Sequence, residues 1–222
     1  MVIFQRRMPP VVAGLIAATL LLSIACAVDA RSDGQLYAHL ALWPERVWAG
    51  EVWRLATWPF VQTTLLSLVF GCITLFGFGA ELEDRWGSAR MFGYMAAVLT
   101  VAGAGTALIA LAAPEVMAYP HLGGWARTSA IVVAWSLQFP ERRILFYGLI
   151  PLGGTDSVTA WCALTVVIAL FIGFAPCVPE LLATGAAVLA MTGGLRGVRT
   201  ILGKRRGKPR IVRDDDDPRW MN

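Results

Sequence analysis

The chain has 222 residues, of which 57% are apolar and only 15% are charged, and its formal net charge is +4. The charged residues are crowded into short stretches between long uncharged runs, which excludes an ordinary soluble domain and predicts an all-α, polytopic membrane protein. The small basic excess requires no nucleic-acid partner, because basic residues beside apolar spans orient a membrane protein.

The first apolar run covers residues 11–28 and follows a short segment, residues 1–10, that contains two arginines. Its length is close to the roughly 20 residues that cross a bilayer as a helix. A small residue, Ala30, follows the run, so a cleavable signal peptide is the alternative. We favour a retained first span, because the uninterrupted run is longer than a typical signal core of about 7–15 residues.

Residues 29–62 form a long loop that is rich in aromatic side chains. These are Tyr37, Trp43, Trp48, Trp53, Trp58 and Phe60. Large amphipathic rings favour the headgroup region of a bilayer. The loop is therefore expected to lie in the membrane interface.

Five more apolar runs follow this loop. They cover residues 63–80, 92–113, 124–139, 158–175 and 181–194. The last run is short and contains many small residues, which let helices approach closely, so we expect it to be an internal helix. Six spans would place the membrane domain in residues 11–196 and leave residues 197–222 as a basic and then acidic tail.

The basic residues are distributed unevenly between the two sides that six spans would define. Fifteen of the 19 Lys and Arg residues fall on the side of the two termini, and Arg31, Arg46, Arg54 and Arg127 fall on the other. The positive-inside rule then predicts that both termini are cytoplasmic. We expect a multi-pass protein of a prokaryotic plasma membrane.

Two segments resemble the rhomboid family of intramembrane serine proteases. They are Gly50-Glu51-Val52-Trp53-Arg54-Leu55 in the first loop and Glu81-Leu82-Glu83-Asp84-Arg85-Trp86-Gly87-Ser88 after the second span. The resemblance implies a six-helix bundle with an interfacial Trp-Arg loop and a Glu-x-x-x-Gly turn. The structural motif residues would be Trp53, Arg54, Glu83, Gly87, Gly123, Gly124 and Gly185. Trp53 would hold the loop with a buried ring, and Arg54 with a hydrogen-bonded guanidinium.

The resemblance also locates the catalytic positions of the family, and each lacks its functional group. The serine nucleophile corresponds to Ala126, and the histidine base on the sixth helix corresponds to Leu182. The histidine and asparagine that help to bind the oxyanion correspond to Ser67 and Gly71. A methyl group cannot attack a carbonyl and an isobutyl group cannot accept a proton, so we predict a catalytically dead protein.

The favoured function is that of a rhomboid-like pseudoprotease that binds transmembrane segments of client proteins or perturbs the local lipid. Arg127 is a possible binding residue, although we expect its long side chain to snorkel to the outer interface. The alternative is an active rhomboid-type endopeptidase with relocated groups, for which Ser129 and His121 are the conceivable pair. No cofactor or metal site is expected.

An unrelated six-helix transporter is the third interpretation. It has little support, because none of the predicted spans contains the Asp, Glu or Lys that ion coupling usually requires.

Overall fold

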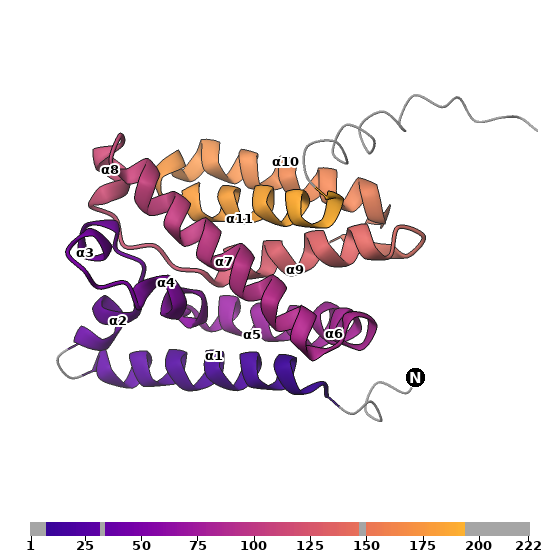
Figure 1. Cartoon of the computed structure of the whole chain (residues 1–222), viewed down its shortest axis with the longest axis horizontal. Coiled ribbons are helices and arrows are strands. Elements are labelled where there is room, and N and C mark those ends of the chain that lie inside the picture. Colours follow the sequence, from indigo (N-terminus) through magenta and orange to yellow (C-terminus); the bar gives the residue numbers. More distant parts are fainter. Residues whose placement is uncertain (1–7, 32–33, 147–149, 194–222) are drawn as a thin grey trace, which may run out of the picture.

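The computed structural model describes residues 8–31, 34–146 and 150–193 of the chain. Most of the predicted N-terminal segment and the whole predicted tail, residues 197–222, lie outside these ranges. The long helices pack into one bundle, and the short helices of the first loop gather at one end of it (Figure 1). A short antiparallel hairpin between α9 and α10 adds two strands to an otherwise helical fold.

The long helices agree with the predicted apolar runs in order and approximate extent. They are α1 (Pro10–Asp29), α5 (Leu65–Thr74) continued by a π-helical turn (Leu75–Gly79) and α6 (Ala80–Trp86), α7 (Ser88–Ala110), α9 (Gly124–Gln138), α10 (Gly154–Ile172) and α11 (Phe174–Thr192). Strands β1 (Arg143–Phe146) and β2 (Ile150–Gly153) form the hairpin.

Four helical segments are long and apolar enough to cross a membrane. They are Pro10–Asp29, Leu65–Trp86, Ser88–Ala110 and Phe174–Thr192. The α9 helix has 15 residues and would be about 22 Å long, which is less than the roughly 30 Å of a hydrocarbon core. The chain is therefore a polytopic membrane protein, and four of the six predicted spans meet the criteria of length and apolar composition.

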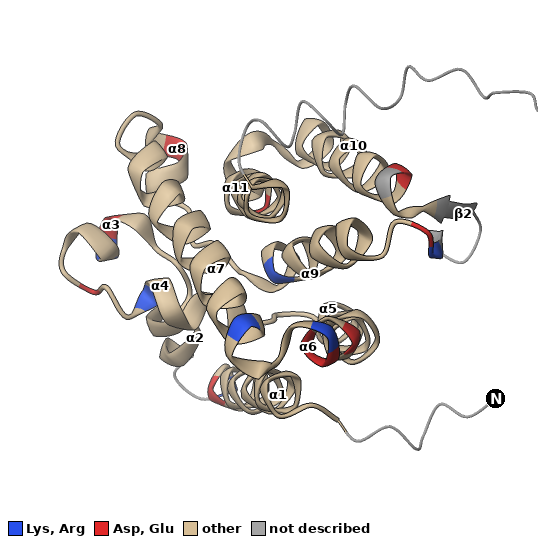
Figure 2. Cartoon of the chain, turned by 45° about the vertical axis from the view of Figure 1, so that its right-hand side comes forward, with Lys and Arg blue, Asp and Glu red and all other residues tan. Residues whose placement is uncertain are grey.

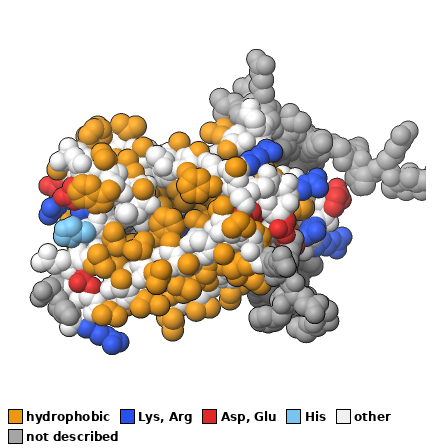
Figure 3. Space-filling view, turned by 60° about the horizontal axis from the view of Figure 1, so that its bottom comes forward, with side chains coloured by type: hydrophobic (Ala, Val, Ile, Leu, Met, Phe, Trp, Pro, Cys, Tyr) orange, Lys and Arg blue, Asp and Glu red, His pale blue; other side chains and the backbone are white. Residues whose placement is uncertain are grey.

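The surface of the bundle is apolar over its middle and charged towards its ends. Figure 3 shows a belt of hydrophobic side chains with the acidic and basic side chains gathered at the two ends of the molecule. Large apolar side chains on α1, α5, α7 and α10 are exposed. Exposed apolar surface of this extent requires lipid around it.

The first loop is more ordered than the sequence predicts. It contains α2 (Gln35–Leu40), α3 (Pro44–Trp48), α4 (Arg54–Thr57) and a 3-10 turn (Trp58–Phe60), and a further short helix, α8 (Pro114–Met117), lies at the same end. Trp48 Nε1 donates a 2.9 Å hydrogen bond to Ala107 O, which ties the loop to α7.

The centre of the bundle is α9, which contacts α5, α7, α10 and α11 (Figure 2). All of its residues from Ala126 to Ser136 are buried. Tyr94 Oη donates to Ala130 O at 2.8 Å, and Trp135 Nε1 donates to Glu81 Oε2 at 2.8 Å. A short helix surrounded by others on all sides can tolerate more polar residues than a helix that faces lipid.

The α11 helix begins at Phe174, seven residues earlier than predicted. Pro176 lies in the first turn of α11, where a missing N–H group has no intrahelical partner to lose, whereas Pro179 lies inside the helix. The sequence predicted an internal helix, but only part of its surface is enclosed. Ala183 and Ala187 are buried, whereas Gly185 and Ala190 are exposed.

Candidate functional site: the start of helix α9

The turn that leads into α9 depends on two glycines that lie against the first loop. Gly123 N donates to Trp58 O at 3.0 Å, and a Cβ atom at Gly123 would lie 2.4 Å from Pro59 Cα. A Cβ atom at Gly124 would lie 1.9 Å from Gln62 Nε2. Backbone atoms of Pro59 crowd Gly123 and the side chain of Gln62 crowds Gly124, so neither position leaves room for a Cβ atom.

Ala126 lies in the first turn of α9 and is buried. Its methyl group contributes to the apolar core. The position that the rhomboid resemblance assigns to the nucleophile is therefore inside the bundle and carries no reactive group.

The sequence predicted that the Arg127 side chain snorkels to the outer interface. This prediction is wrong, because the side chain is 0% exposed. Its Nη1 donates to Thr19 Oγ1 on α1 and to Pro59 O at 3.2 Å. Its Nε and Nη2 atoms are buried without a hydrogen-bond partner among the described residues. An arginine keeps its charge in proteins, so a guanidinium edge without partners is the most unusual feature of this region.

Gly71 on α5 belongs to the same cluster. A Cβ atom there would lie 3.0 Å from Arg127 Nη2 and 3.7 Å from Gln62 Nε2. Because Gly71 has no side chain, the Arg127 guanidinium can lie directly against α5. Ser67, one turn earlier on α5, is only half-buried and exchanges hydrogen bonds with Thr64, so it is not part of the cluster.

Leu182 and Gly185 on α11 do not complete a site with Ala126. The side chain of Leu182 packs on α7, where a Cβ atom added at Gly105 would lie 3.0 Å from its Cδ1. Gly185 has open space around it, so the close helix approach predicted at this glycine is wrong.

The Trp-Arg pair of the first loop divides into one buried and one exposed residue. Arg54 is 2% exposed; its Nε donates to Glu51 Oε2 at 2.8 Å, and its Nη1 donates to Ala38 O and, at 2.9 Å, to Ala41 O. Trp53 is 49% exposed, so the buried ring predicted for it is wrong. The fully buried tryptophan of this loop is Trp58.

Glu83 and Gly87 hold the turn between α6 and α7. The buried carboxylate of Glu83 accepts hydrogen bonds from Val11 N, Val12 N and Ser88 Oγ at 2.9, 2.8 and 2.6 Å. Gly87 adopts φ +82°, a conformation that favours glycine. Glu83 thus links the start of α1 to the start of α7, and Gly87 provides the sharp turn between α6 and α7.

A second polar cluster contains a carboxylate that the sequence reasoning missed. Glu180 Oε1, in the second turn of α11, accepts hydrogen bonds from Ser129 Oγ at 3.2 Å and Thr165 Oγ1 at 3.3 Å. Trp161 Nε1 donates to Ser129 Oγ at 2.8 Å. The expectation that no span contains an acidic residue is wrong, because Glu180 was assigned to a loop when the start of α11 was placed at Leu181.

Ser129 and His121 do not form the relocated pair considered from the sequence. Ser129 is bonded within the Glu180 cluster, whereas His121 Nε2 lies 3.2 Å from Val116 O in the loop before α9. Leu42 and His121 exchange backbone hydrogen bonds, which fixes this loop beside α2. Burial lowers the pKa of His121 below its usual value of 6.5.

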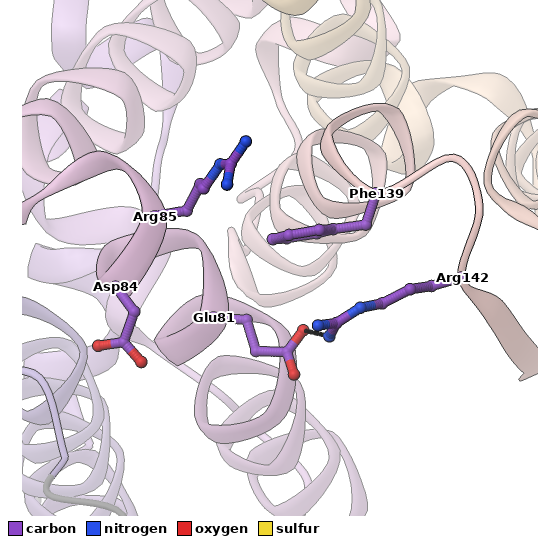
Figure 4. Close-up of a pocket in the computed structure, with 5 residues that line it drawn as sticks. All are labelled: Glu81, Asp84, Arg85, Phe139 and Arg142. Carbon is purple, nitrogen blue, oxygen red and sulfur yellow. Dashed lines mark hydrogen bonds and ion pairs between the residues drawn. The ribbon is translucent and has the colours of Figure 1, made fainter.

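The other end of the bundle has a shallow pocket of about 210 Å³ between α6 and the end of α9 (Figure 4). Arg142 forms an ion pair with Glu81 across it and lies over the Phe139 ring, and Asp84 points away from this pair. Glu81 and Arg142 thus form an ion pair at this pocket, unlike the guanidinium at the start of α9. In the part of the chain that the structure describes, no group of three His, Cys, Asp or Glu residues could hold a metal ion.

Comparison with known families places the chain among membrane proteins. A family model described as "Eukaryotic integral membrane protein (DUF1751)" matches residues 12–197, which cover the six long helical segments apart from the first two residues of α1. No curated protein matches the sequence. The family description is eukaryotic, so the prediction of a prokaryotic plasma membrane is wrong, whereas the apolar helices support an integral membrane location. Because the match covers most of its length, the chain belongs to this family of eukaryotic integral membrane proteins.

Proposed function

We propose that this protein is a rhomboid-like, non-catalytic membrane protein that binds transmembrane segments of other proteins or perturbs the local lipid, and the structure favours the first. Its six long helical segments would be six spans, with the short α9 enclosed by the others. An interfacial first loop held by Arg54 and a turn held by Glu83 support the rhomboid-like arrangement.

One observation carries the non-catalytic part of the proposal. The first turn of α9 presents Ala126 and a buried arginine where a rhomboid-type protease needs a nucleophile and a small residue. Leu182, at the position of the base, packs on α7. A serine hydroxyl requires a neighbouring base and prepared oxyanion donors to attack a peptide bond, and these positions supply neither.

The exposed apolar faces of α5 and α10 support the binding of transmembrane segments. Leu66 on α5 is 81% exposed and Phe171 on α10 is 88% exposed. The π-helical turn Leu75–Gly79 interrupts the α5–α6 span and contains two glycines, which favours bending at this point. A helix that bends there can expose the start of α9 to a partner helix.

The test of this proposal is the capture of membrane partners by crosslinking. Full-length protein is crosslinked in its native membrane through a photoreactive group at residue 66 or 171, and the crosslinked partners are then purified and identified. We expect the captured partners to be single-span or multi-pass membrane proteins. The same photoreactive group placed at Glu45 in the first loop is the control and should not capture them. Capture of lipid alone at both helix positions would contradict the binding of transmembrane segments.

The second candidate is an intramembrane serine endopeptidase with relocated groups, and one observation favours it. Ser129 Oγ is hydrogen-bonded to a carboxylate, Glu180 Oε1, which could act as a base. The non-catalytic proposal predicts no labelling of the purified protein by a fluorophosphonate probe. Labelling that disappears in Ser129→Ala, and is absent from Glu180→Gln, would instead establish the endopeptidase.

A further inference from the structure

The guanidinium of Arg127 and the amide of Gln62 bring buried donors close to the same point on α5. Arg127 Nε and Nη2 and Gln62 Nε2 are all buried without partners in the described part of the chain. Arg127 Nη2 and Gln62 Nε2 lie 3.0 and 3.7 Å from a single point, the Cβ position of Gly71. The Nε and Nη2 atoms form one edge of the guanidinium, which matches the two oxygens of a carboxylate.

The charge of this cluster has no counterion among the residues that the structure describes. Nη1 is bonded to a hydroxyl and to a carbonyl oxygen, and both are neutral. A buried charge without a paired anion costs several kcal/mol. The cluster is therefore built to receive an anionic group with at least two acceptor oxygens.

The depth of the cluster distinguishes between the possible anions. Thr19, which contacts the guanidinium, is nine residues from Pro10 and ten from Asp29, the two ends of α1. At 1.5 Å per residue it lies about 14 Å from each end of the helix, close to the middle of the bilayer. A phosphate in a lipid headgroup stays near the surface, whereas an acidic side chain of a transmembrane helix can lie at this depth.

We propose that Arg127 and Gln62 form a mid-membrane receptor for a carboxylate carried by the transmembrane segment of a partner protein. The acidic side chain would accept hydrogen bonds from Nε and Nη2 of Arg127, and Gln62 Nε2 would donate to its remaining lone pairs. Movement of α5 about the π-helical turn would admit it. This inference rests on the proposed function and specifies the chemistry of the partner.

Binding of designed single-span peptides tests the inference. The full-length protein is reconstituted in phosphatidylcholine vesicles, and energy transfer reports its association with leucine–alanine helices that carry Asp, Asn or Leu at the central position. We expect the Asp peptide to bind at least about tenfold more tightly than the Asn peptide. An Asp moved two turns towards either end of the peptide should lose this advantage.

Two variants locate the effect. Arg127→Gln should reduce the preference for Asp to about twofold or less, and Gln62→Leu, which leaves the arginine intact, should reduce it by a smaller factor. Arg90→Gln is the matched control, because Arg90 lies on the bundle exterior over the Trp86 ring, and it should keep the full preference. The melting midpoint of each variant confirms that the protein is folded.

The outcomes separate this inference from the proposed function. Equal binding of the Asp, Asn and Leu peptides would overturn the carboxylate receptor and leave the binding of transmembrane segments intact, whereas no binding of any peptide would overturn both. A preference that survives in Arg127→Gln would also overturn the receptor. Loss of the preference when phosphatidic acid or inorganic phosphate is added would assign the site to phosphate and overturn the peptide carboxylate.

Discussion

The carboxylate of Glu83 accepts a 2.8 Å hydrogen bond from the backbone N–H of Val12, 71 residues earlier in the chain. A second bond comes from Val11 N, so this side chain of α6 caps the start of α1. The first N–H groups of a helix have no intrahelical partners, and a carboxylate also interacts favourably with the helix dipole.

Replacement of Glu83 should therefore loosen the packing of α1 on the bundle. Glu83→Ala leaves two backbone donors and the Ser88 hydroxyl without their acceptor, and we expect a loss of about 1–3 kcal/mol in unfolding free energy. The measurement is the melting midpoint in detergent, with the exposed Glu115→Ala as the control. Equal midpoints for the two variants would show that the cap contributes nothing.

The stability of the first loop should depend on pH through the hydrogen bond between Glu51 and Arg54. The side-chain hydrogen bond from Arg54 lowers the pKa of Glu51 below its usual value of 4.5. A lowered pKa in the folded state means that the contribution to stability is present above pH 4.5 and is lost as the pH falls through the folded-state pKa. The melting midpoint of the unmodified protein should fall on acidification in this window. The midpoint of the Glu51→Gln variant should fall less.

Within the same loop, Arg54→Ala should lower the melting midpoint much more than Trp53→Ala. The first change leaves the carbonyls of Ala38 and Ala41 without their donor, whereas Trp53 is half exposed. A larger effect of Trp53→Ala would show that the ring is buried against something other than this chain.

The cluster around Glu180 should show energetic coupling. Ser129 and Glu180 share a hydrogen bond between α9 and α11, and such bonds in membrane proteins contribute about 0.6 kcal/mol on average and up to about 1.7. A double-mutant cycle of Ser129→Ala and Glu180→Ala should therefore give a coupling free energy in this range. Strictly additive effects would rule out a contribution from this bond.

The helices were predictable from sequence because each apolar run is long and bounded by charged or turn residues. The start of α11 was not, because the apolar run 158–175 continues across Gly173, the single residue that separates α10 from α11. The burial of Arg127 was also not predictable. A residue at the end of a span is expected to reach water, and only the approach of α1 and the first loop encloses it.

The two glycines Gly123 and Gly185 provide the most direct comparison between a close backbone approach and an open one. A methyl group at position 123 would lie 2.4 Å from Pro59 Cα, a backbone atom that cannot rotate away, whereas nothing lies within 4 Å of a methyl group at position 185. Gly123→Ala must therefore separate the start of α9 from the first loop and should cost about 1–3 kcal/mol or more.

Gly185→Ala should instead be neutral or stabilising by up to about 1 kcal/mol, because alanine is the better helix former and the position is exposed. The melting midpoints of the two variants, measured side by side in the same detergent, give the comparison. If Gly185→Ala is the more damaging change, then α11 meets another helix at this face in the membrane, as in an oligomer, and the rhomboid motif position is a packing position after all. If Gly123→Ala is tolerated without a change in midpoint, the first loop does not rest on α9, and the enclosure of Arg127 that the carboxylate receptor requires would be lost with it.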